Sequence, residues 1–139
     1  MFENPAFRDV WAPRLLSIVR IVLGLLYMQH GLSKYLGFPT PAPPNFQAAS
    51  LYGLAGLIEI VGGLLLALGV YTRWVAFIIS GEMAVAFFFV RQRLSTSFFP
   101  LRSGGQLEAV YSIFFFTFFL VGGGAWSIDT LRRRPQRRI

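Results

Sequence analysis

The sequence contains no cysteine and a single histidine, His30, in 139 residues. The absence of cysteine excludes disulfide bonds, thiolate catalysis, iron–sulfur clusters and cysteine-ligated zinc. One histidine is too few for a bis-histidine haem. Charged residues are also scarce, at 14% of the chain, whereas soluble globular proteins carry about 25%. A soluble domain of this size could not cover its surface with so few charges, so lipid is the predicted main solvent.

Hydrophobic residues, by contrast, make up 55% of the chain. They are concentrated in four stretches, each close to the roughly 20 residues that an α-helix needs to cross a bilayer core of about 30 Å. The stretches run about 15–35, 51–71, 73–90 and 107–126. Only helices and closed barrels can span lipid, and these runs are too long and too uniformly apolar for barrel strands. We therefore predict an all-α integral membrane protein.

Short polar or proline-rich segments separate the four stretches. Residues 38–45 contain four prolines and cannot be helical throughout. Residues 71–73 form a tight connection, so the second and third helices are expected to form an antiparallel hairpin. The segment 91–106 contains three arginines, a proline and two adjacent glycines. The sequence predicts one domain over 1–139, a four-transmembrane-helix bundle that ends in a basic tail over 127–139.

A cleaved signal peptide is the alternative for the first apolar stretch. Its apolar core is longer than the usual 7–15 residues or so, and it carries Arg20, His30 and Lys34. We therefore interpret it as a retained membrane helix.

The basic residues other than Arg20 are unevenly distributed between the two predicted sides. One side carries eight and the other four. The eight are Arg8, Arg14, Arg73, Arg132, Arg133, Arg134, Arg137 and Arg138, and the four are Lys34, Arg91, Arg93 and Arg102. The positive-inside rule then predicts that both termini are cytoplasmic. We interpret the basic tail as a topology anchor beside anionic lipid, and we expect no nucleic-acid partner.

Six ionisable residues fall within the predicted spans, where an isolated charge at the bilayer centre costs roughly 2.5–3.5 kcal/mol. They are Arg20, His30, Lys34, Glu59, Glu82 and Glu108. We expect these side chains to face the bundle interior and to pair with one another. Gly24 and Gly31 share a face of the first span with Lys34, and Gly56 and Gly63 share a face of the second span with Glu59. Small residues let backbones approach closely in lipid, so Glu59 is expected on a tight packing face.

Depth along the helices divides these residues into two groups. One is expected to converge in the outer half of the membrane as a ligand-binding or proton-handling cluster. It consists of His30, Lys34, Glu59 and Glu108, with Gln106 nearby. The spacing of these residues matches no recognised metal-ligand pattern, so no metal site is predicted.

The second group lies nearer the centre. Arg20 and Glu82 are expected to pair there and to hold the helices in register. For both groups, the alternative is a purely structural role, in which buried ion pairs fix helix register without taking part in chemistry.

An ordered set of short motifs covers nearly the whole chain. It comprises Gln29-His30-Gly31-Leu32-Ser33-Lys34, Gly37-Phe38-Pro39, Gly56-Leu57-Ile58-Glu59, Gly62-Gly63, Leu68-Gly69-Val70-Tyr71-Thr72-Arg73, Gly81-Glu82-Met83-Ala84-Val85-Ala86, Phe98-Phe99-Pro100, Gly104-Gly105 and Gly122-Gly123-Gly124-Ala125-Trp126-Ser127-Ile128-Asp129. In this order the set resembles the DoxX family of small bacterial membrane proteins. The family pattern has a glutamate directly after the double glycine. Here that position is Gln106, and Glu108 follows two residues later.

The resemblance implies a multi-pass protein of the bacterial inner membrane. It also implies a role as an oxidoreductase or as a subunit linked to quinone metabolism, thiosulfate oxidation or oxidative-stress complexes. The sequence shows no flavin, nicotinamide or haem motif, because its paired glycines lie in apolar helices. Any electrons would therefore come from a bound quinone or from a partner protein.

Three functions are compatible with these features. The first is a redox-associated membrane subunit, in which Lys34 and His30 hydrogen-bond the oxygens of a quinone-type molecule and Glu59 exchanges a proton with it. The second is a non-catalytic anchor or scaffold that recruits a soluble oxidoreductase. The third is a small-molecule transporter, which with four helices would need to be a homo-oligomer.

Overall fold

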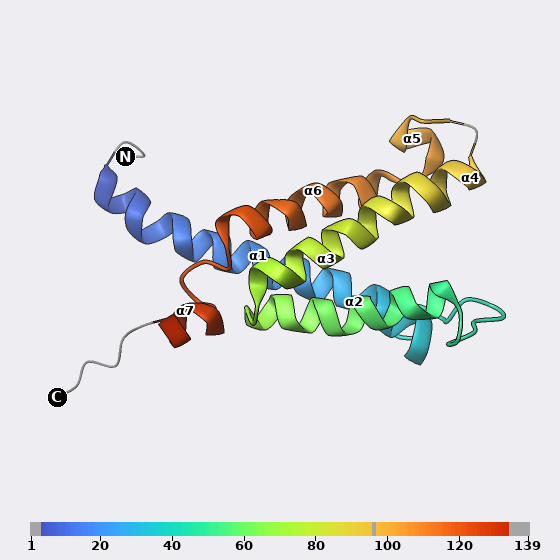
Figure 1. Ribbon diagram of the computed structural model, residues 1–139, viewed down its shortest axis with the longest axis horizontal. Coiled ribbons are helices and arrows are strands. Elements are labelled where there is room, and N and C mark those ends of the chain that lie inside the picture. Colours follow the sequence, from blue (N-terminus) through green and yellow to red (C-terminus); the bar gives the residue numbers. More distant parts are fainter. Residues whose placement is uncertain (1–3, 96, 134–139) are drawn as a thin grey trace.

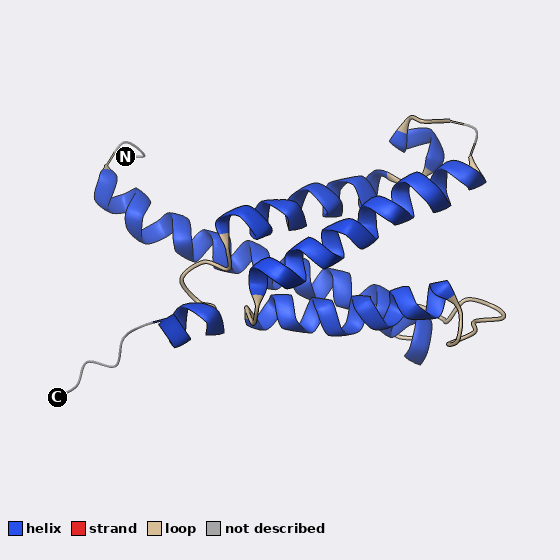
Figure 2. Cartoon of the chain, viewed as in Figure 1, coloured by secondary structure: helices blue, strands red, loops and turns tan. Residues whose placement is uncertain are grey.

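The computed structural model describes residues 4–95 and 97–133, which are helices joined by loops, with no strand in these ranges (Figure 1, Figure 2). The long helices are α1 (Pro5–Leu36), α2 (Leu51–Leu68), α3 (Thr72–Val85) and α6 (Gln106–Val121). The shorter elements are the π-helical turn η1 (Ala86–Arg91), α4 (Gln92–Leu94), α5 (Pro100–Ser103) and α7 (Ile128–Arg133). Helix α3 runs without interruption through η1 into α4.

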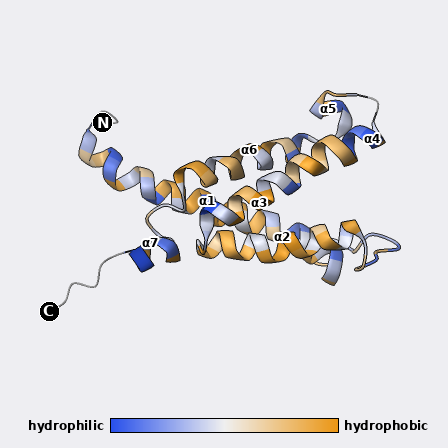
Figure 3. Ribbon diagram, in the orientation of Figure 1, coloured by the Kyte–Doolittle hydropathy of each residue, from blue (hydrophilic) through white to orange (hydrophobic). Residues whose placement is uncertain are grey.

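Three helical segments are long and apolar enough to cross a membrane. They are Pro5–Leu36, Leu51–Leu68 and Thr72–Leu94. Helix α6 is also apolar, but with 16 residues it is shorter. Figure 3 shows hydrophobic residues along the middle of these helices and hydrophilic residues in α7, α4 and the loop after α1. This is the distribution of a helical membrane protein.

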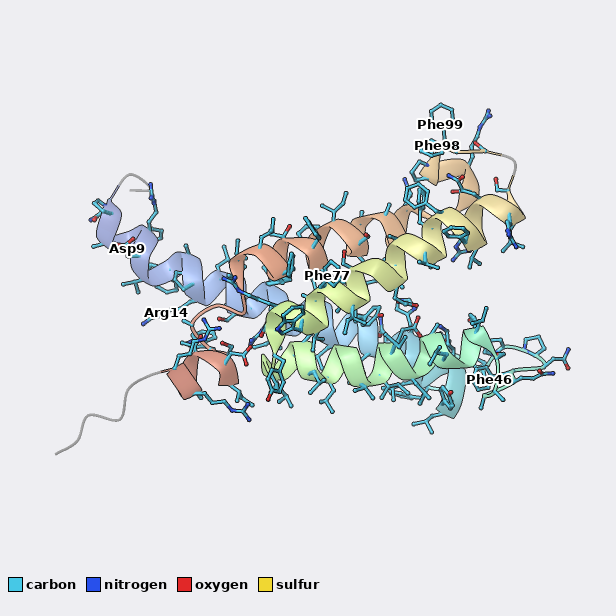
Figure 4. All side chains as sticks on the ribbon, viewed as in Figure 1. Asp9, Arg14, Phe46, Phe77, Phe98 and Phe99 are labelled. Atoms are coloured by element: carbon cyan, nitrogen blue, oxygen red, sulfur yellow. The ribbon has the colours of Figure 1, made fainter. Side chains whose placement is uncertain are left out.

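The long helices form two antiparallel hairpins, α1 with α2 and α3 with α6. The hairpins meet near α7 and diverge toward the other end (Figure 1). Phe46 at the tip of the first hairpin and Phe98 at the tip of the second lie far apart (Figure 4). We call the end with α7 and the α2–α3 turn the basic end, and the end with the 37–50 and 95–105 segments the loop end. The α2–α3 connection is tight, as predicted, but it covers residues 69–71 and not 71–73, because α2 ends at Leu68 and α3 begins at Thr72.

Glycines allow α1 and α2 to pack closely. A Cβ atom added at Gly24 would lie 2.8 Å from the carbonyl oxygen of Gly63, and one at Gly31 would collide with the carbonyl oxygen of Gly56. Small residues at such positions let backbones approach each other in lipid, where no hydrophobic effect drives helices together. The glycine face of α2 is therefore a tight packing face, as predicted, and α1 is the helix that packs on it.

Aromatic side chains join the first hairpin to α6. The ring of Tyr27 on α1 lies edge-on to Phe115, with 5.0 Å between centroids. Tyr111 and Phe115 stack on each other at 5.3 Å, with an interplanar angle of 4°. All three residues are buried, and they form the core together with Ile79 and Phe118. The two hairpins are therefore bridged by large side chains more than by close backbone contact.

Two helix boundaries differ from the prediction because of local capping. Helix α1 begins at Pro5, well before residue 15, because Asn4 caps it by accepting a hydrogen bond from the Ala6 amide at 3.0 Å. Helix α6 ends at Val121, before residue 126, because Gly122 has a φ of 87° that a helix cannot continue.

The basic tail expected over 127–139 is not extended chain throughout. Its first part forms α7, over Ile128–Arg133. The remaining basic residues of that tail, Arg134, Arg137 and Arg138, lie outside the described residues.

Candidate functional site

Six polar side chains from four helices gather between the two hairpins, and we call them the buried polar cluster. Helix α1 contributes Tyr27, His30 and Lys34, α2 contributes Glu59, α3 contributes Glu82, and α6 contributes Glu108. The three residues of α1 share a face because they are spaced by three and four positions. Each of the four long helices thus supplies at least one polar group.

The Lys34–Glu59 ion pair joins the two helices of the first hairpin. The Lys34 Nζ atom lies 2.8 Å from Oε1 and 2.7 Å from Oε2 of Glu59, and the two side chains are 10% and 6% exposed. The ammonium group also lies 4.2 Å from the centroid of the Tyr52 ring. Gly56, one turn before Glu59, leaves room for the lysine stem, since a Cβ there would be 3.1 Å from Lys34 Cδ. The structure therefore brings together two residues of the predicted outer cluster.

A second contact, Tyr27–Glu82, joins the two hairpins. The Tyr27 hydroxyl donates a hydrogen bond of 2.6 Å to Glu82 Oε2, which is short and typical of a carboxylate acceptor. Tyr27 was not among the predicted site residues. Its position on the face that also carries Gly24, Gly31 and Lys34 could have indicated it, because a buried tyrosine hydroxyl needs a partner.

Glu108 pairs with Arg91 at the edge of the cluster. Arg91 Nε lies 2.7 Å from Glu108 Oε1, and the arginine side chain is 42% exposed. The second oxygen of Glu108 is buried and has no hydrogen-bond partner among the described residues. Arg91 belongs to the π-helical turn, so its direction could not be inferred from α-helical spacing.

His30 lies between these contacts. Its half-buried ring is edge-on to Tyr111, with 6.1 Å between centroids. The charges of Lys34 and Glu108 both act on the imidazole. The charges of the same two residues act on Glu82, which in turn acts on Glu59. The six groups therefore form a single electrostatic network.

The charges of this network are unbalanced. Two cations, Lys34 and Arg91, face three carboxylates, so full ionisation would leave one negative charge uncompensated. A buried carboxylate without a cationic partner is a group that can exchange protons with a bound molecule. Over residues 4–95 and 97–133, no three His, Asp or Glu side chains are placed to hold a metal ion.

An apolar groove runs beside the cluster, between α2 and α3. Its volume is about 290 Å³. It is lined by Leu57, Ile58, Val61, Gly62, Leu65, Val75, Ile78 and Ile79. Gly62 separates it from the cluster, since a Cβ added there would lie 2.7 Å from Ile79 Cγ2 and 3.8 Å from Tyr27 Cε1. The groove therefore lies on α2 and α3 close to the cluster, but the buried Tyr27 ring does not line it.

Comparison with known proteins identifies the family. The DoxX family model matches residues 15–92, which is more than half of the chain. The chain belongs to the DoxX family. An uncharacterized protein of Haemophilus influenzae (strain ATCC 51907 / DSM 11121 / KW20 / Rd) is 40% identical over 124 residues, which cover 87% of this chain and 92% of that protein. No solved structure matches the chain.

Gln106, at the position where the DoxX pattern has its glutamate, does not join the cluster. It is the first residue of α6 and is exposed. Glu108, two residues later, is turned inward and carries the acidic group at this end of α6. The structure therefore places Gln106 outside the cluster and Glu108 at its edge, where it pairs with Arg91, and a role of either residue in binding stays a prediction.

The predicted Arg20–Glu82 pair is wrong for this DoxX-family chain. Arg20 Nη2 donates to the Trp126 carbonyl oxygen at 2.8 Å, whereas Glu82 accepts from Tyr27. Side chains on a helix point toward its N-terminus. Because α1 has its N-terminus at the basic end, the long arginine side chain is carried toward that end and away from the cluster.

Proposed function

We propose that this DoxX-family protein is a redox-associated membrane protein that binds a quinone-type molecule at the buried polar cluster. One observation carries the proposal. The acidic residues of the Lys34–Glu59 and Tyr27–Glu82 contacts lie on α2 and α3, the two helices that line an apolar groove. A molecule with a polar ring and an apolar tail is the type of ligand whose two parts match these two environments.

The cluster has the hydrogen-bonding groups that a quinone and its reduced form require. The Lys34 ammonium and the Tyr27 hydroxyl are donors suited to the carbonyl oxygens of a quinone. Glu59 and Glu82 are acceptors suited to the hydroxyl groups of a quinol. Reduction of a quinone consumes two electrons and two protons, and the carboxylates would pass the protons while a partner oxidoreductase supplies the electrons. The chain would then be the membrane subunit of a redox complex.

The proposed setting is the bacterial inner membrane, with both termini cytoplasmic. It rests on the excess of basic residues at the end that carries Arg14, Arg73 and α7. In this orientation four helices span the membrane and the cluster lies in its outer half. A fusion of a reporter that is active only in the cytoplasm to each terminus tests it, because the orientation requires both fusions to be active.

Quinone retention by the purified protein tests the proposed ligand. The protein is extracted in mild detergent, and its bound small molecules are measured by mass spectrometry and absorbance. Wild type is expected to retain quinone at a stoichiometry near one. Glu59→Gln and Lys34→Met are expected to reduce the retained quinone by about tenfold, because each removes a charged partner from the site.

Asp9→Asn and Arg93→Met are the matched controls, because both residues are exposed and lie outside the cluster. Circular dichroism confirms that each variant keeps its helices. Wild type that retains no quinone, even after reconstitution with ubiquinone or menaquinone, would contradict the proposal. So would equal retention by both cluster variants. A quinone-free preparation that co-purifies with a soluble oxidoreductase would instead favour the alternative function, a non-catalytic membrane anchor that recruits this enzyme.

A further inference from the structure

A polar crevice of about 300 Å³ lies at the basic end, between the α2–α3 turn, the glycine segment 122–124 and α7. Its polar lining comes from Thr72, Arg73, Ser127, Asp129, Thr130 and Arg133. None of these residues belongs to the buried polar cluster. The crevice is therefore a second site candidate, and it is independent of the proposed quinone site.

The one acidic residue of the crevice is already occupied. The Asp129 carboxylate accepts hydrogen bonds from the backbone amides of Tyr71 at 2.8 Å and Thr72 at 2.7 Å. Its own amide donates to the Gly69 carbonyl oxygen at 3.0 Å. Asp129 thus caps the start of α3, whose own N-cap residue makes no side-chain hydrogen bond. Its carboxylate is therefore hydrogen-bonded to backbone N–H groups and has no ion pair within 4.0 Å among the described residues, although its charge interacts with those of Arg20 and Arg133.

The cations of the crevice have no such partners. Within the described ranges, no carboxylate lies within 4.0 Å of the charged nitrogens of Arg73 or Arg133. The Arg73 guanidinium lies along Gly122, where a Cβ would be 3.6 Å from its Nε. Arg20 adds a third positive charge behind the wall of the crevice, and it is fully buried. Two arginines therefore line a crevice that contains one carboxylate, and a third arginine is buried behind its wall.

Two buried donor groups meet at Gly123 without acceptors. The Thr72 side chain is 1% exposed and lines the crevice; its Oγ1 lies near the Asp129 carboxylate but makes no hydrogen bond of normal geometry among the described residues. Nε and Nη1 of Arg20 are also unpartnered there. A Cβ added at Gly123 would lie 2.7 Å from Thr72 Oγ1 and 3.0 Å from Arg20 Nη1. Buried donors of this kind normally have acceptors, so an acceptor is missing from this end of the protein.

We propose that the crevice binds a phosphoryl group, held by Arg73, Arg133 and the hydroxyl of Thr72. Guanidinium groups match the geometry of phosphate oxygens and form strong bidentate hydrogen bonds with them. The buried charge of Arg20 favours an anion at the same place. The phosphoryl group belongs either to a free phosphate compound or to the headgroup of an anionic phospholipid, since the crevice lies at an end of the membrane helices.

Phosphate titration of the purified full-length protein tests the site. Unfolding is followed by tryptophan fluorescence, which reports on this region through Trp126, in detergent and in buffer without phosphate. Inorganic phosphate is compared with chloride at constant ionic strength. Wild type is expected to show saturable stabilisation by phosphate. Arg73→Gln and Thr72→Val are expected to weaken this response by about tenfold, because each removes a donor.

Arg132→Gln is the matched control for Arg73→Gln. It removes the same charge from exposed Arg132, which does not line the crevice. Its phosphate response is expected to stay within about twofold of wild type. Equal weakening by the two variants would show a diffuse basic surface and overturn the proposal.

A second experiment, with defined lipids, distinguishes the two sources of the phosphoryl group. The protein is placed in phosphatidylcholine nanodiscs with and without phosphatidylglycerol, and the lipids that remain bound are counted by native mass spectrometry. For a lipid headgroup, phosphatidylglycerol is retained by wild type, lost in Arg73→Gln and able to abolish the phosphate response. For a free phosphate compound, the phosphate response persists in both membranes. The absence of any response to phosphate and to phosphatidylglycerol would overturn the proposal.

Discussion

The two ends of the bundle are held together by different kinds of contact. At the basic end, loop backbone bonds directly to α1. The Ala125 amide donates to the Pro13 carbonyl oxygen at 3.0 Å, and the Trp126 amide donates to Ser17 Oγ at 2.9 Å. Toward the loop end, the bonds between helices are made by charged and phenolic side chains, as in Lys34–Glu59.

We interpret this difference as a division between a region that fixes the helices and the region of the proposed binding site. Backbone contacts that depend on glycine leave no alternative arrangement, so they fix the geometry of the helices. Buried ion pairs are weak sources of stability, because the cost of removing both charges from water offsets most of their attraction. A cluster that stabilises so little is better explained by the binding of a molecule. The predictions below test this division, beginning with the largest expected effect.

Breaking the Lys34–Glu59 pair on one side is expected to have the largest effect on stability. Lys34→Met leaves the Glu59 carboxylate buried without its cation, which costs about 3–5 kcal/mol. Replacing both residues, as in Lys34→Met/Glu59→Met, is expected to restore most of that stability but not quinone retention. Chemical unfolding in detergent, followed by circular dichroism, measures both variants. A double variant as unstable as the single one would show that the pair is structural.

At the basic end, Gly124→Val is expected to destabilise the protein by about 2–4 kcal/mol. Gly124 has a φ of 81°, and a Cβ there would lie 2.5 Å from Ser17 Oγ and 2.6 Å from the Pro13 carbonyl oxygen. The same unfolding measurement applies. Gly81→Ala is the control, because a Cβ at Gly81 meets nothing within 4 Å and alanine favours the helix.

The comparison between the basic end and the loop end also predicts how much quinone the Gly124→Val variant retains. The fraction of this variant that folds is expected to retain as much quinone as wild type. A folded variant that had lost its quinone would couple the two ends and contradict their separation.

Removing the cap on α3 is expected to have an intermediate effect that depends on pH. Asp129→Asn weakens two hydrogen bonds to backbone amides, at a cost of about 1–2 kcal/mol at neutral pH. Burial opposes the ionisation of Asp129, but the bonds from Thr72 and Tyr71 and the charge of Arg133 outweigh it and lower its pKa. The folded protein therefore binds the proton of Asp129 more weakly than the unfolded chain does.

The sign of the pH effect follows from this difference. The contribution of Asp129 is complete above the pKa of the unfolded chain, about 3.9, and is lost as the pH falls through the lower folded-state value. The stability of wild type and Asp129→Asn is therefore expected to converge in acid. Unfolding curves between neutral and acidic pH measure the difference in unfolding free energy between the two proteins. A difference that is independent of pH would contradict the capping role of Asp129.

The sequence was sufficient to predict those features that depend on the spacing of residues along a helix and on the free-energy cost of placing a charged side chain in lipid. Apolar runs of spanning length predicted the long helices. The spacing of Gly56 and Gly63 predicted a tight packing face on α2, although not that α1 packs on it. Lys34 and Glu59 were expected to converge because neither could face lipid alone.

The remaining features depend on side-chain reach and on backbone angles that hydropathy does not report. Arg20 was paired with the wrong residue because depth was counted at its Cα, whereas its guanidinium group reaches toward the basic end. The segment 122–126 was taken as helix because it is apolar, but the φ of Gly122 ends α6. Arg91 was missed as a partner of Glu108 because a π-helical turn changes the direction of the side chains it carries.

The smallest effect is expected at the edge of the cluster, where Glu108 meets Arg91. Glu108→Gln is expected to change stability by about 0–1 kcal/mol, because Arg91 is 42% exposed and water can solvate it when its partner is neutral. The difference should shrink further at high salt, which screens exposed pairs. Quinone retention is expected to stay within about twofold of wild type. A loss of quinone as large as in Glu59→Gln would move the centre of the site toward α6 and place Glu108, despite its half-exposed partner, in direct contact with the ligand.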